Sequence, residues 1–394
     1  MHNYVALTLR GDHYTMGRQH GRQVKQLRPH IVEAIEARFR QIERDGPDAR
    51  FEALLRETRE VLETLDAPLL DMIRGQAEAL EFEFDTLLRY DLVAYLRDAL
   101  TTRHRNGASG ELVRHRNGAS GELARKAVDG EGCTTWAATG SATANGQPML
   151  VKNRDYRLEH LPLQIVVRAT PGSGYRYVYS GSAGSPGVFC GGINQAGLAI
   201  ADTHVSSTDV GPGLPDYALM MHILESYGDV SSALDYVRSV PRLGRNNLIM
   251  ADARGHLAVF EIGHRTCGAL ETHEGTLVNT NHFASPGLQT CFVDTNPPQT
   301  EGNSFHRYEK VTNELRAARG RIDVRFAQRL MATHEGPLAS ICRHPRAGSA
   351  PSEWPSEDDG ESATVSTSIF LPALRKMLFC HGLPCRGHYD DFVL

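Results

Sequence analysis

Residues 129–156 read DGEGCTTWAATGSATANGQPMLVKNRDY, and this stretch decides the fold that we predict. Two short apolar segments rich in β-forming residues flank the Asn-Gly dipeptide at 145–146, which is typical of a tight β-hairpin turn. A hairpin here would bring Cys133, at the start of its first strand, to the same edge as Arg154 and Asp155, at the end of its second. A cation near a thiol favours the thiolate, so Cys133 is a candidate nucleophile. The residues alone leave open that it is a small core residue instead.

Length and composition restrict the classes to which the chain can belong. Its 394 residues, 41% of them hydrophobic, are enough for one large or two modest domains with a sizeable core. The net charge of -5 argues against a dedicated nucleic-acid binder. The sequence contains no run of about 18 apolar residues that would predict a membrane span. The N-terminus lacks the charged start and apolar stretch of a signal peptide. Seven cysteines, an odd number without close pairs, predict a reduced, cytoplasmic protein.

The first hundred or so residues are predicted to be helical, because they hold only three of the 19 prolines and five of the 37 glycines. Apolar residues recur with helical spacing in four segments: 16–42, 51–65, 68–80 and 84–100. Asp66, followed by Ala-Pro, is a signal for a helix N-cap with proline in the first turn.

A break follows at 101–131, where the sequence RHRNGASGEL occurs twice, at 103–112 and 114–123. These polar, glycine-containing copies carry little to bury, so we predict a mobile linker. A basic nucleic-acid-binding arm is the alternative, but no aromatic residue is interleaved for base stacking, and we predict no nucleic-acid partner. A linker directly before Gly132 and Cys133 is what a removable pro-segment would have.

From residue 133 onward the sequence predicts short strands separated by glycine and proline, with helices in later blocks. The predicted strands lie near 133–139, 148–153, 163–169, 175–180, 187–193, 197–203, 247–252, 256–262, 276–281 and 366–382. The predicted helices lie at 216–227, 230–239, 303–318 and 322–334. Strands in hairpins with helices in later blocks favour antiparallel sheets flanked by helices, so we assign the α+β class.

Gly-Cys-Thr-Thr at 132–135, followed by Asn-Arg-Asp-Tyr at 153–156, resembles the N-terminal-nucleophile (Ntn) hydrolases of the penicillin acyltransferase type. This family includes acyl-coenzyme A:6-aminopenicillanic acid acyltransferase and the β-alanyl-amine hydrolases, with bile-salt hydrolases as more distant relatives. The opening run GDHYTMGRQHG at 11–21 is similar to the family's N-terminal signature. The resemblance implies a four-layer αββα sandwich with an added N-terminal helical segment, made as an inactive precursor that cuts itself before a cysteine.

The residues at the expected junction suit such a self-cleavage. Cys133 Sγ would attack the carbonyl carbon of Gly132, which has no side chain to crowd it, and water would then release residues 1–132. The new α-amine has a pKa of about 7.7–8.0 and the thiol one of about 8.5, so the amine can act as local base. Residues 1–132 would become an α-chain associated with a catalytic β-chain, 133–394, in one integrated domain. Further oligomerisation is left open.

The resemblance assigns roles to several other side chains. Asp155 matches the family's aspartate that holds the freed amine toward the thiol, and Arg154 would favour the thiolate or meet a substrate carboxylate. Asn281 resembles the asparagine whose neutral amide stabilises the oxyanion. Tyr156 is a candidate for the pocket wall, and the hydroxyl of Thr134 for a part in processing. Without the resemblance, Asn281 and the Arg-Asp pair would fit turn residues as well.

Four further residues are expected near the site. The strand that leaves the Gly-rich turn at 192–199 would bring Asp202 and His204 toward it, and His204 stands where distant relatives have a second oxyanion asparagine. His282 is the obvious partner if Cys133 belongs to a Cys-His dyad instead. Arg307, near the start of a predicted helix, fits the family pattern and would support the site electrostatically.

We predict no metal site and no cofactor. His13 and His20 would share one helix without a third ligand nearby, so solvated or capping histidines are the preferred interpretation. A second group has zinc-binding residue types, but its spacings match no standard zinc pattern: Cys342, His344, Cys380 and Cys385.

The sequence therefore predicts a self-processing amidohydrolase or acyltransferase that takes an acyl group from a small amide or thioester through an acyl-enzyme on Cys133. Water or an amine would resolve this intermediate, and the substrate stays open among β-lactam side chains, β-alanyl amines and N-acyl amino acids. Two alternatives remain. One is an unprocessed, non-catalytic family member that binds a small ligand in the same cleft. The other is a conventional Cys-His hydrolase that needs no cleavage.

Overall fold

The computed structural model describes residues 4–45, 49–93, 132–296, 300–345 and 362–394. Its strands form an eight-stranded sheet in the order β1-β4-β5-β6-β7-β8-β9-β10 and a six-stranded sheet in the order β11-β2-β3-β12-β13-β14. The duplicated segment 103–123 and the rest of the predicted linker lie outside the described residues.

The strands of the eight-stranded sheet are β1 Val5–Gly11, β4 Gln164–Pro171, β5 Tyr177–Ser182, β6 Gly191–Asn194, β7 Ala199–His204, β8 Asn246–Ala251, β9 Leu257–Ile262 and β10 Cys267–Thr272. Those of the six-stranded sheet are β2 Thr134–Gly140, β3 Gly146–Arg157, β11 Gly275–Asn279, β12 Ser362–Leu371, β13 Lys376–His381 and β14 Tyr389–Val393. The helices include α1 His13–Gln23, α2 Arg28–Asp45, α3 Ala49–Leu65, α4 Ala67–Leu80, α6 Asp216–Ser226, α7 Val230–Ser239, α8 Pro286–Gln289, α9 Asn303–Ala317, α10 Val324–Met331 and α11 Gly336–Ala339. Short 3-10 turns are η1 Lys25–Leu27, η3 Leu158–His160 and η4 Pro372–Leu374.

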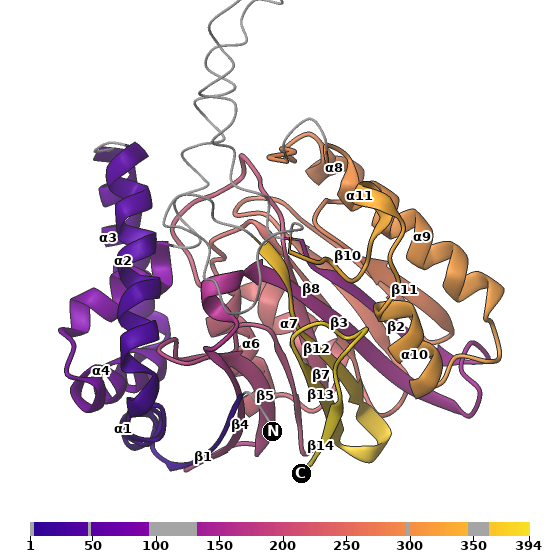
Figure 1. Ribbon diagram of the computed structural model, residues 1–394. Coiled ribbons are helices and arrows are strands. Elements are labelled where there is room, and N and C mark those ends of the chain that lie inside the picture. The colour runs from indigo at the N-terminus through magenta and orange to yellow at the C-terminus, as the bar shows by residue number, and fades with distance from the viewer. Residues whose placement is uncertain (1–3, 46–48, 94–131, 297–299, 346–361) are drawn as a thin grey trace, which may run out of the picture.

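The two sheets pack face to face and helices cover both outer faces (Figure 1). Between the sheets, Ala137 and Leu150 of the six-stranded sheet join one apolar cluster with Val166 and Ile249 of the other. The N-terminal helices, α6 and α7 bury the outer face of the eight-stranded sheet, and α9 and α10 bury that of the six-stranded sheet. The predicted α+β class and the four-layer αββα sandwich are therefore confirmed.

The hairpin of β2 and β3 is as predicted. The two strands pair antiparallel, with Thr134 opposite Asn153, so Cys133 lies at the same edge as Arg154. The turn ends at Gly146, whose φ of 73° is a conformation that glycine adopts without strain.

The N-terminal segment is joined to the sandwich through its own strand. β1 pairs with β4 in parallel, the exception to the antiparallel pattern of the other described strand pairs. The single helix predicted over 16–42 is wrong, because α1 ends at Gln23 and α2 begins at Arg28. Pro29 has no N–H and its ring would clash with a preceding helical turn, so it fits only the first turn of a new helix. Of the segment predicted over 84–100, residues 84–93 are helical and the rest lies outside the described residues.

The C-terminal strands differ from prediction in a similar way. The segment predicted as one strand over 366–382 is two strands, β12 and β13, joined by η4 at Pro372 and by Arg375 in the left-handed region. Two edge strands, β10 and β14, were not predicted. Both alternate weakly between apolar and polar residues and are largely exposed or half-buried, which removes the periodic signal of a buried strand.

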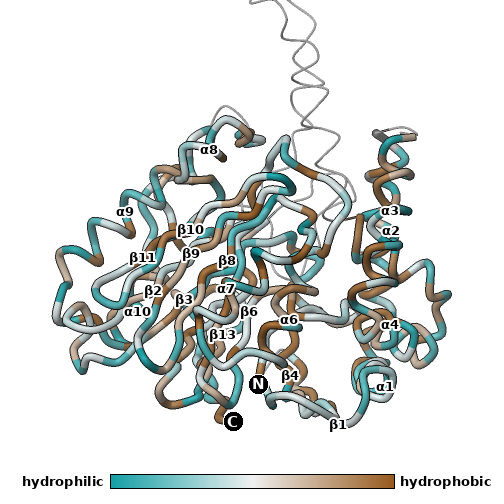
Figure 2. Tube along the Cα trace, turned by 180° about the vertical axis from the view of Figure 1, so that it is seen from behind, coloured by the Kyte–Doolittle hydropathy of each residue, from teal (hydrophilic) through white to brown (hydrophobic). Residues whose placement is uncertain are grey.

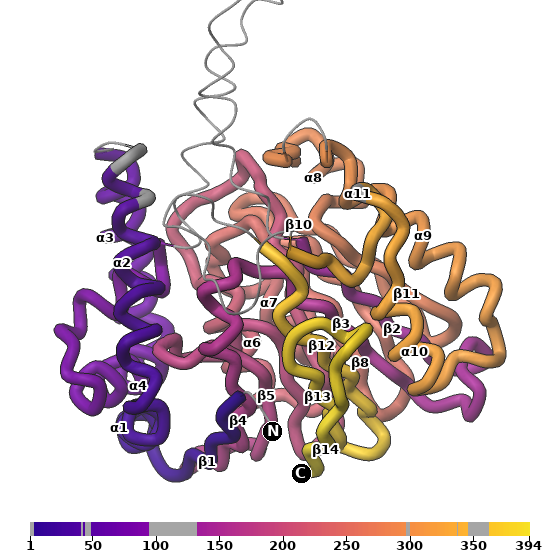
Figure 3. Tube along the Cα trace, in the orientation of Figure 1, coloured from indigo at the N-terminus to yellow at the C-terminus, as the bar shows by residue number. Residues whose placement is uncertain are grey.

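Helix α6 is buried on nearly all sides, which matches its hydrophobic colouring in Figure 2. The two ends of the described chain lie close together (Figure 3): the hydroxyl of Tyr4 donates to Asp390 Oδ2 at 2.8 Å, and its ring packs edge-on against Phe379. Among the helices that the structure describes, none is long and apolar enough to cross a membrane.

Helices α1 and α4 cross at unusually close range. A Cβ added at Gly17 would lie 2.0 Å from the carbonyl oxygen of Met72, and one at Gly75 would lie 2.1 Å from that of Tyr14. Backbone atoms on both sides cannot move away as a flexible side chain would. These two glycines therefore set how closely the helices approach.

We predict that Gly17→Ala lowers the free energy of unfolding by about 1–3 kcal/mol or more, the range typical of overpacked sites, because the two helices must separate. Chemical denaturation measures the loss. Gly287→Ala is the matched control, since its added Cβ would have its nearest neighbour, Thr266 Cγ2, at 3.8 Å. Equal effects of the two substitutions would contradict the close-crossing argument.

Candidate active site

The backbone of Cys133 is held on both sides by polar side chains. Its N–H donates to Asn281 Oδ1 at 2.9 Å, and its carbonyl oxygen accepts from Arg307 Nη1 at 2.6 Å. Arg307 Nη2 also donates to Asn281 Oδ1, at 2.7 Å, which closes the arrangement. The structure thus brings together three residues that the sequence predicted for the site.

Asn281 and Arg307 owe their positions to β11 and α9. β11 pairs antiparallel with β2, so the residues that follow it reach the start of β2 and Cys133. The N–H of Asn281 donates to Ser304 Oγ at 2.8 Å, and Ser304 lies one helical turn before Arg307 on α9. The Asn281 amide nitrogen donates to the carbonyl oxygen of His204 at 2.8 Å, and its second N–H can donate to an oxyanion.

Asp155 lies on the other side of the junction. Its Oδ1 accepts from Thr364 Oγ1 at 2.6 Å, whereas its buried Oδ2 has no hydrogen-bond partner among the described residues. A Cβ on Gly132 would lie 3.3 Å from this Oδ2. Burial raises the pKa of the carboxyl group to about 6, against the opposing charges of Arg343 and Arg307. A buried acceptor without a partner among the described residues, beside the residue that precedes Cys133 and its predicted α-amine, suits the role predicted for Asp155.

Lys152 is a site residue that the sequence analysis missed. It is buried and forms an ion pair with Asp202 of β7, which the analysis did expect near the site. Burial raises the pKa of the Cys133 thiol to about 12, and the positive charge of Lys152 is the main opposing influence. The available signal was a lysine directly after the apolar run 148–151 and two residues before Arg154, where alternation puts both side chains on one face.

Arg154 and Tyr156 line a pocket beside Cys133. Arg154 donates to Ser182 Oγ at 3.0 Å and to Gln164 Oε1 at 3.3 Å, and its guanidinium lies 4.7 Å from the Tyr156 ring centroid. The Tyr156 hydroxyl accepts from Arg38 at 2.9 Å. The pocket also contains Lys152, Asp91, Asp202, His160 and His204. Several cationic side chains therefore converge on the cavity next to the thiol.

The remaining candidates occupy different places. Thr134 is buried and its hydroxyl accepts from Arg307 Nη1 at 2.9 Å. His204 lines the pocket and its ring contacts Arg245 at 3.1 Å. His282 instead hydrogen bonds through Nδ1 to Ser304 Oγ at 2.8 Å and does not line the pocket, and burial lowers its pKa to about 4. This position gives no geometric support to a Cys133–His282 dyad.

The family model of acyl-coenzyme A:6-aminopenicillanic acid acyl-transferase matches residues 141–384, which is more than half of the chain. The chain belongs to this family. The match contains Asp155, Asn281 and Arg307 and begins after Cys133. It supports an amidohydrolase or acyltransferase activity, in agreement with the resemblance seen in the sequence. No curated protein matches the chain.

Solved structures with a similar arrangement share little sequence with the chain. A mutant conjugated bile acid hydrolase from Clostridium perfringens is 12% identical with a TM-score of 0.46, over 66% of this chain and 97% of that one. Penicillin V acylase from Agrobacterium tumefaciens is 16% identical with a TM-score of 0.41, over 66% and 86%. The N-acylethanolamine-hydrolyzing acid amidase ortholog of Caenorhabditis elegans is 16% identical with a TM-score of 0.42, over 61% and 94%.

The Lys152–Asp202 pair should tune the Cys133 thiol in opposite directions. We predict that Lys152→Met raises the pH at which Cys133 is alkylated and Asp202→Asn lowers it, each by about one to three units, because each removes one charge near the thiol. Mass spectrometry of the Cys133 peptide after iodoacetamide pulses at a series of pH values measures both shifts. Lys376→Met, which breaks the surface pair with Asp391, is the matched control. Shifts of the same sign in both site variants would contradict this account.

Asp155 should make the uncut chain less stable as the pH rises. Its pKa is about 6 in the folded chain and 3.8 in its ordinary state, so between these values the folded protein keeps a proton that the unfolded chain has lost. Stability therefore falls as the pH rises from about 4 through about 6, by a total of about 3 kcal/mol for a shift of about two units.

We predict that the Asp155→Asn protein, whose amide at this position cannot ionise, is more stable at neutral pH than the protein with Asp155. This advantage should disappear near pH 4. Urea denaturation of both proteins in a Cys133→Ala background, which keeps them as single chains, measures the difference at each pH. A stability difference that does not change with pH would overturn the assignment.

Proposed function

We propose that this chain is a self-processing cysteine Ntn enzyme, an amidohydrolase or acyltransferase that uses Cys133 as nucleophile. The observation that carries the proposal is the environment of the Gly132–Cys133 junction. Asn281 and Arg307 hold the Cys133 backbone, and the unpartnered Oδ2 of Asp155 lies beside Gly132. Family membership supports the class of reaction.

Self-cleavage would begin with attack of Cys133 Sγ on the carbonyl carbon of Gly132. The C–N bond between them breaks, the nitrogen takes up a proton, and a thioester joins Gly132 to Sγ. Water then hydrolyses the thioester, leaving a carboxylate on Gly132 and a free thiol on Cys133. A Cβ at position 132 would lie 2.6 Å from Arg343 Nη1, so a larger residue here would require the Arg343 guanidinium to move.

Cleavage would also solve the problem of thiol ionisation. Burial keeps the pKa of Cys133 high in the uncut chain, so its thiol is protonated at neutral pH. The new α-amine supplies a base on the same residue, and Asp155 Oδ2 can accept a hydrogen bond from it and orient it. The thiolate then attacks the acyl carbonyl of the substrate, and the amide nitrogen of Asn281 donates to the oxyanion that forms.

The substrate is a small acyl amide or acyl thioester, and either water or an amine receives the acyl group. Arg154, which lines the pocket and donates to the neutral side chains of Ser182 and Gln164, favours a substrate that carries a carboxylate or another anionic group. The α- and β-chains stay associated as a heterodimer, because β1 pairs with β4 across the cut. A cytoplasmic location stays a prediction that rests on the cysteine pattern.

Intact mass under denaturing conditions tests the proposal. We predict two fragments that meet at Gly132 and Cys133 for the wild-type protein and one full-length chain for Cys133→Ala, because only the thiol can form the thioester. His282→Asn, whose amide can replace the Nδ1 hydrogen bond to Ser304, should be cleaved like the wild type.

A single full-length species in the wild type would sink the self-processing proposal. Acylation of Cys133 in that uncut protein by activated acyl thioesters would then favour the conventional hydrolase, provided that His282→Asn abolishes it. Ligand binding without acylation would favour a non-catalytic member.

A further inference from the structure

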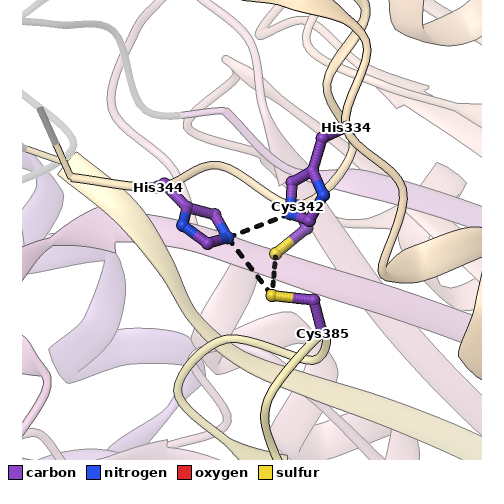
Figure 4. A group of neighbouring side chains, drawn as sticks. All are labelled: His334, Cys342, His344 and Cys385. Carbon is purple, nitrogen blue, oxygen red and sulfur yellow. Dashed lines mark hydrogen bonds between the residues drawn. The ribbon is translucent and has the colours of Figure 1, made fainter. Parts of the chain in front are cut away.

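Four side chains with metal-binding atoms gather at a place that the proposed reaction does not use. His334 follows α10, Cys342 and His344 lie between α11 and β12, and Cys385 follows β13. Their ligand atoms all lie within 4.8 Å of one another. Figure 4 shows the two imidazoles and two thiols pointing toward one another from these separate segments.

The separations suit a tetrahedral ion. Zn–S bonds of about 2.3 Å and Zn–N bonds of about 2.0–2.1 Å imply ligand-to-ligand distances of about 3.8 Å for S–S, about 3.5 Å for S–N and about 3.3 Å for N–N. The observed distances are 3.7 Å from Cys342 Sγ to Cys385 Sγ and 3.2 Å from Cys385 Sγ to His344 Nε2. His334 Nε2 and His344 Nε2 are 2.9 Å apart. The other pairs of ligand atoms lie within 4.8 Å of one another, so an ion at the centre would need movements of about 1 Å or less.

We propose that His334, Cys342, His344 and Cys385 bind a structural zinc ion. Two thiolates and two imidazoles are the donor set that zinc prefers, and four protein ligands leave no open position for catalysis. The zinc-binding residue types noted in the sequence included Cys380 in place of His334. Cys380 lies on β13 and is not one of the four converging residues.

The surroundings permit an ion to enter and bind. Cys342 is buried and Cys385 is half-buried, which shields the thiolates, whereas His334 and His344 are exposed and leave a path from solvent. Without an ion, two imidazole Nε2 atoms face each other and two thiols face each other. A cation that accepts electron pairs from all four accounts for this arrangement.

The ion would fix a segment that reaches the active site. Arg343 lies between two of the ligands, and its backbone exchanges hydrogen bonds with Thr364, N–H to Oγ1 at 2.9 Å and carbonyl oxygen from N–H at 3.0 Å. Thr364 Oγ1 in turn donates to Asp155, and Arg343 Nη1 lies near Gly132. Zinc would thus hold in place the segment that supports the Gly132–Cys133 junction, without contacting the reacting atoms.

A disulfide between Cys342 and Cys385 is the competing explanation of the two facing thiols. It would leave the convergence of the two histidines without a role. The zinc site and the disulfide are mutually exclusive, because zinc requires both sulfurs as thiolates. One set of measurements can therefore decide between them.

The first experiment measures zinc in the full-length protein, purified without an affinity tag of histidines and dialysed against metal-free buffer. We expect one zinc ion per chain by plasma mass spectrometry, and loss of bound zinc in Cys385→Ser and His344→Ala. Cys380→Ser is the matched control and should keep its zinc.

Cobalt replacement in the wild-type protein tests the proposal even if a variant fails to fold. Chelation followed by Co²⁺ should give thiolate-to-cobalt charge-transfer absorption and the ligand-field bands of tetrahedral cobalt. Chelation should also lower the Tm of the wild type and leave that of Cys385→Ser unchanged. A wild type with no zinc and no cobalt spectrum would overturn the proposal, and so would a Cys342–Cys385 disulfide in peptides from protein kept in zinc-containing buffer. Neither result would bear on cleavage at Cys133.

Discussion

The buried guanidinium of Arg307 is the interaction on which the rest of the site depends. It donates to the Cys133 carbonyl, to Thr134, to Asn281 and to Asn303, and so joins the start of β2, the end of β11 and the first turn of α9. Burial lowers its pKa to about 10, which still leaves it charged at neutral pH. A charge in this position is tolerable only because each of these partners is in place. The geometry around Cys133 therefore depends on three elements rather than on β2 alone.

Two further charged groups flank the thiol, and they lie on opposite faces of β3. Lys152 faces the other sheet and pairs with Asp202, while Asp155 faces the helical layer and bonds to Thr364. The first balances the negative charge that a thiolate at Cys133 would bring. Asp155 keeps an acceptor oxygen without a hydrogen-bond partner among the described residues, which lowers the stability of the uncut chain. Such an arrangement is expected where function, and not folding, selects the residue.

The sequence was informative where the determinants are local. The hairpin of β2 and β3 was predicted correctly, because turn chemistry and alternation act over a few residues, although its connection covers 141–145 and Gly146 already belongs to β3. Asn281 and Arg307 contact Cys133, which lies 148 and 174 positions away in the sequence, so only the family resemblance could suggest them. Lys152 and His334 were missed because their partners lie on other segments, and no spacing rule brings those segments together.

The strand β12 shows why the site and the four-residue cluster belong to one structure. Near its start, Thr364 bonds to Asp155 through its hydroxyl and to Arg343 through its backbone, so the position of one fixes that of the other. Before Arg343, Ile341 is part of the core under α9 and α10, so apolar burial anchors the segment on this side. A zinc ion that joins Cys342 and His344 to Cys385 would add a second anchor next to Arg343, which lies beside the proposed cleavage junction.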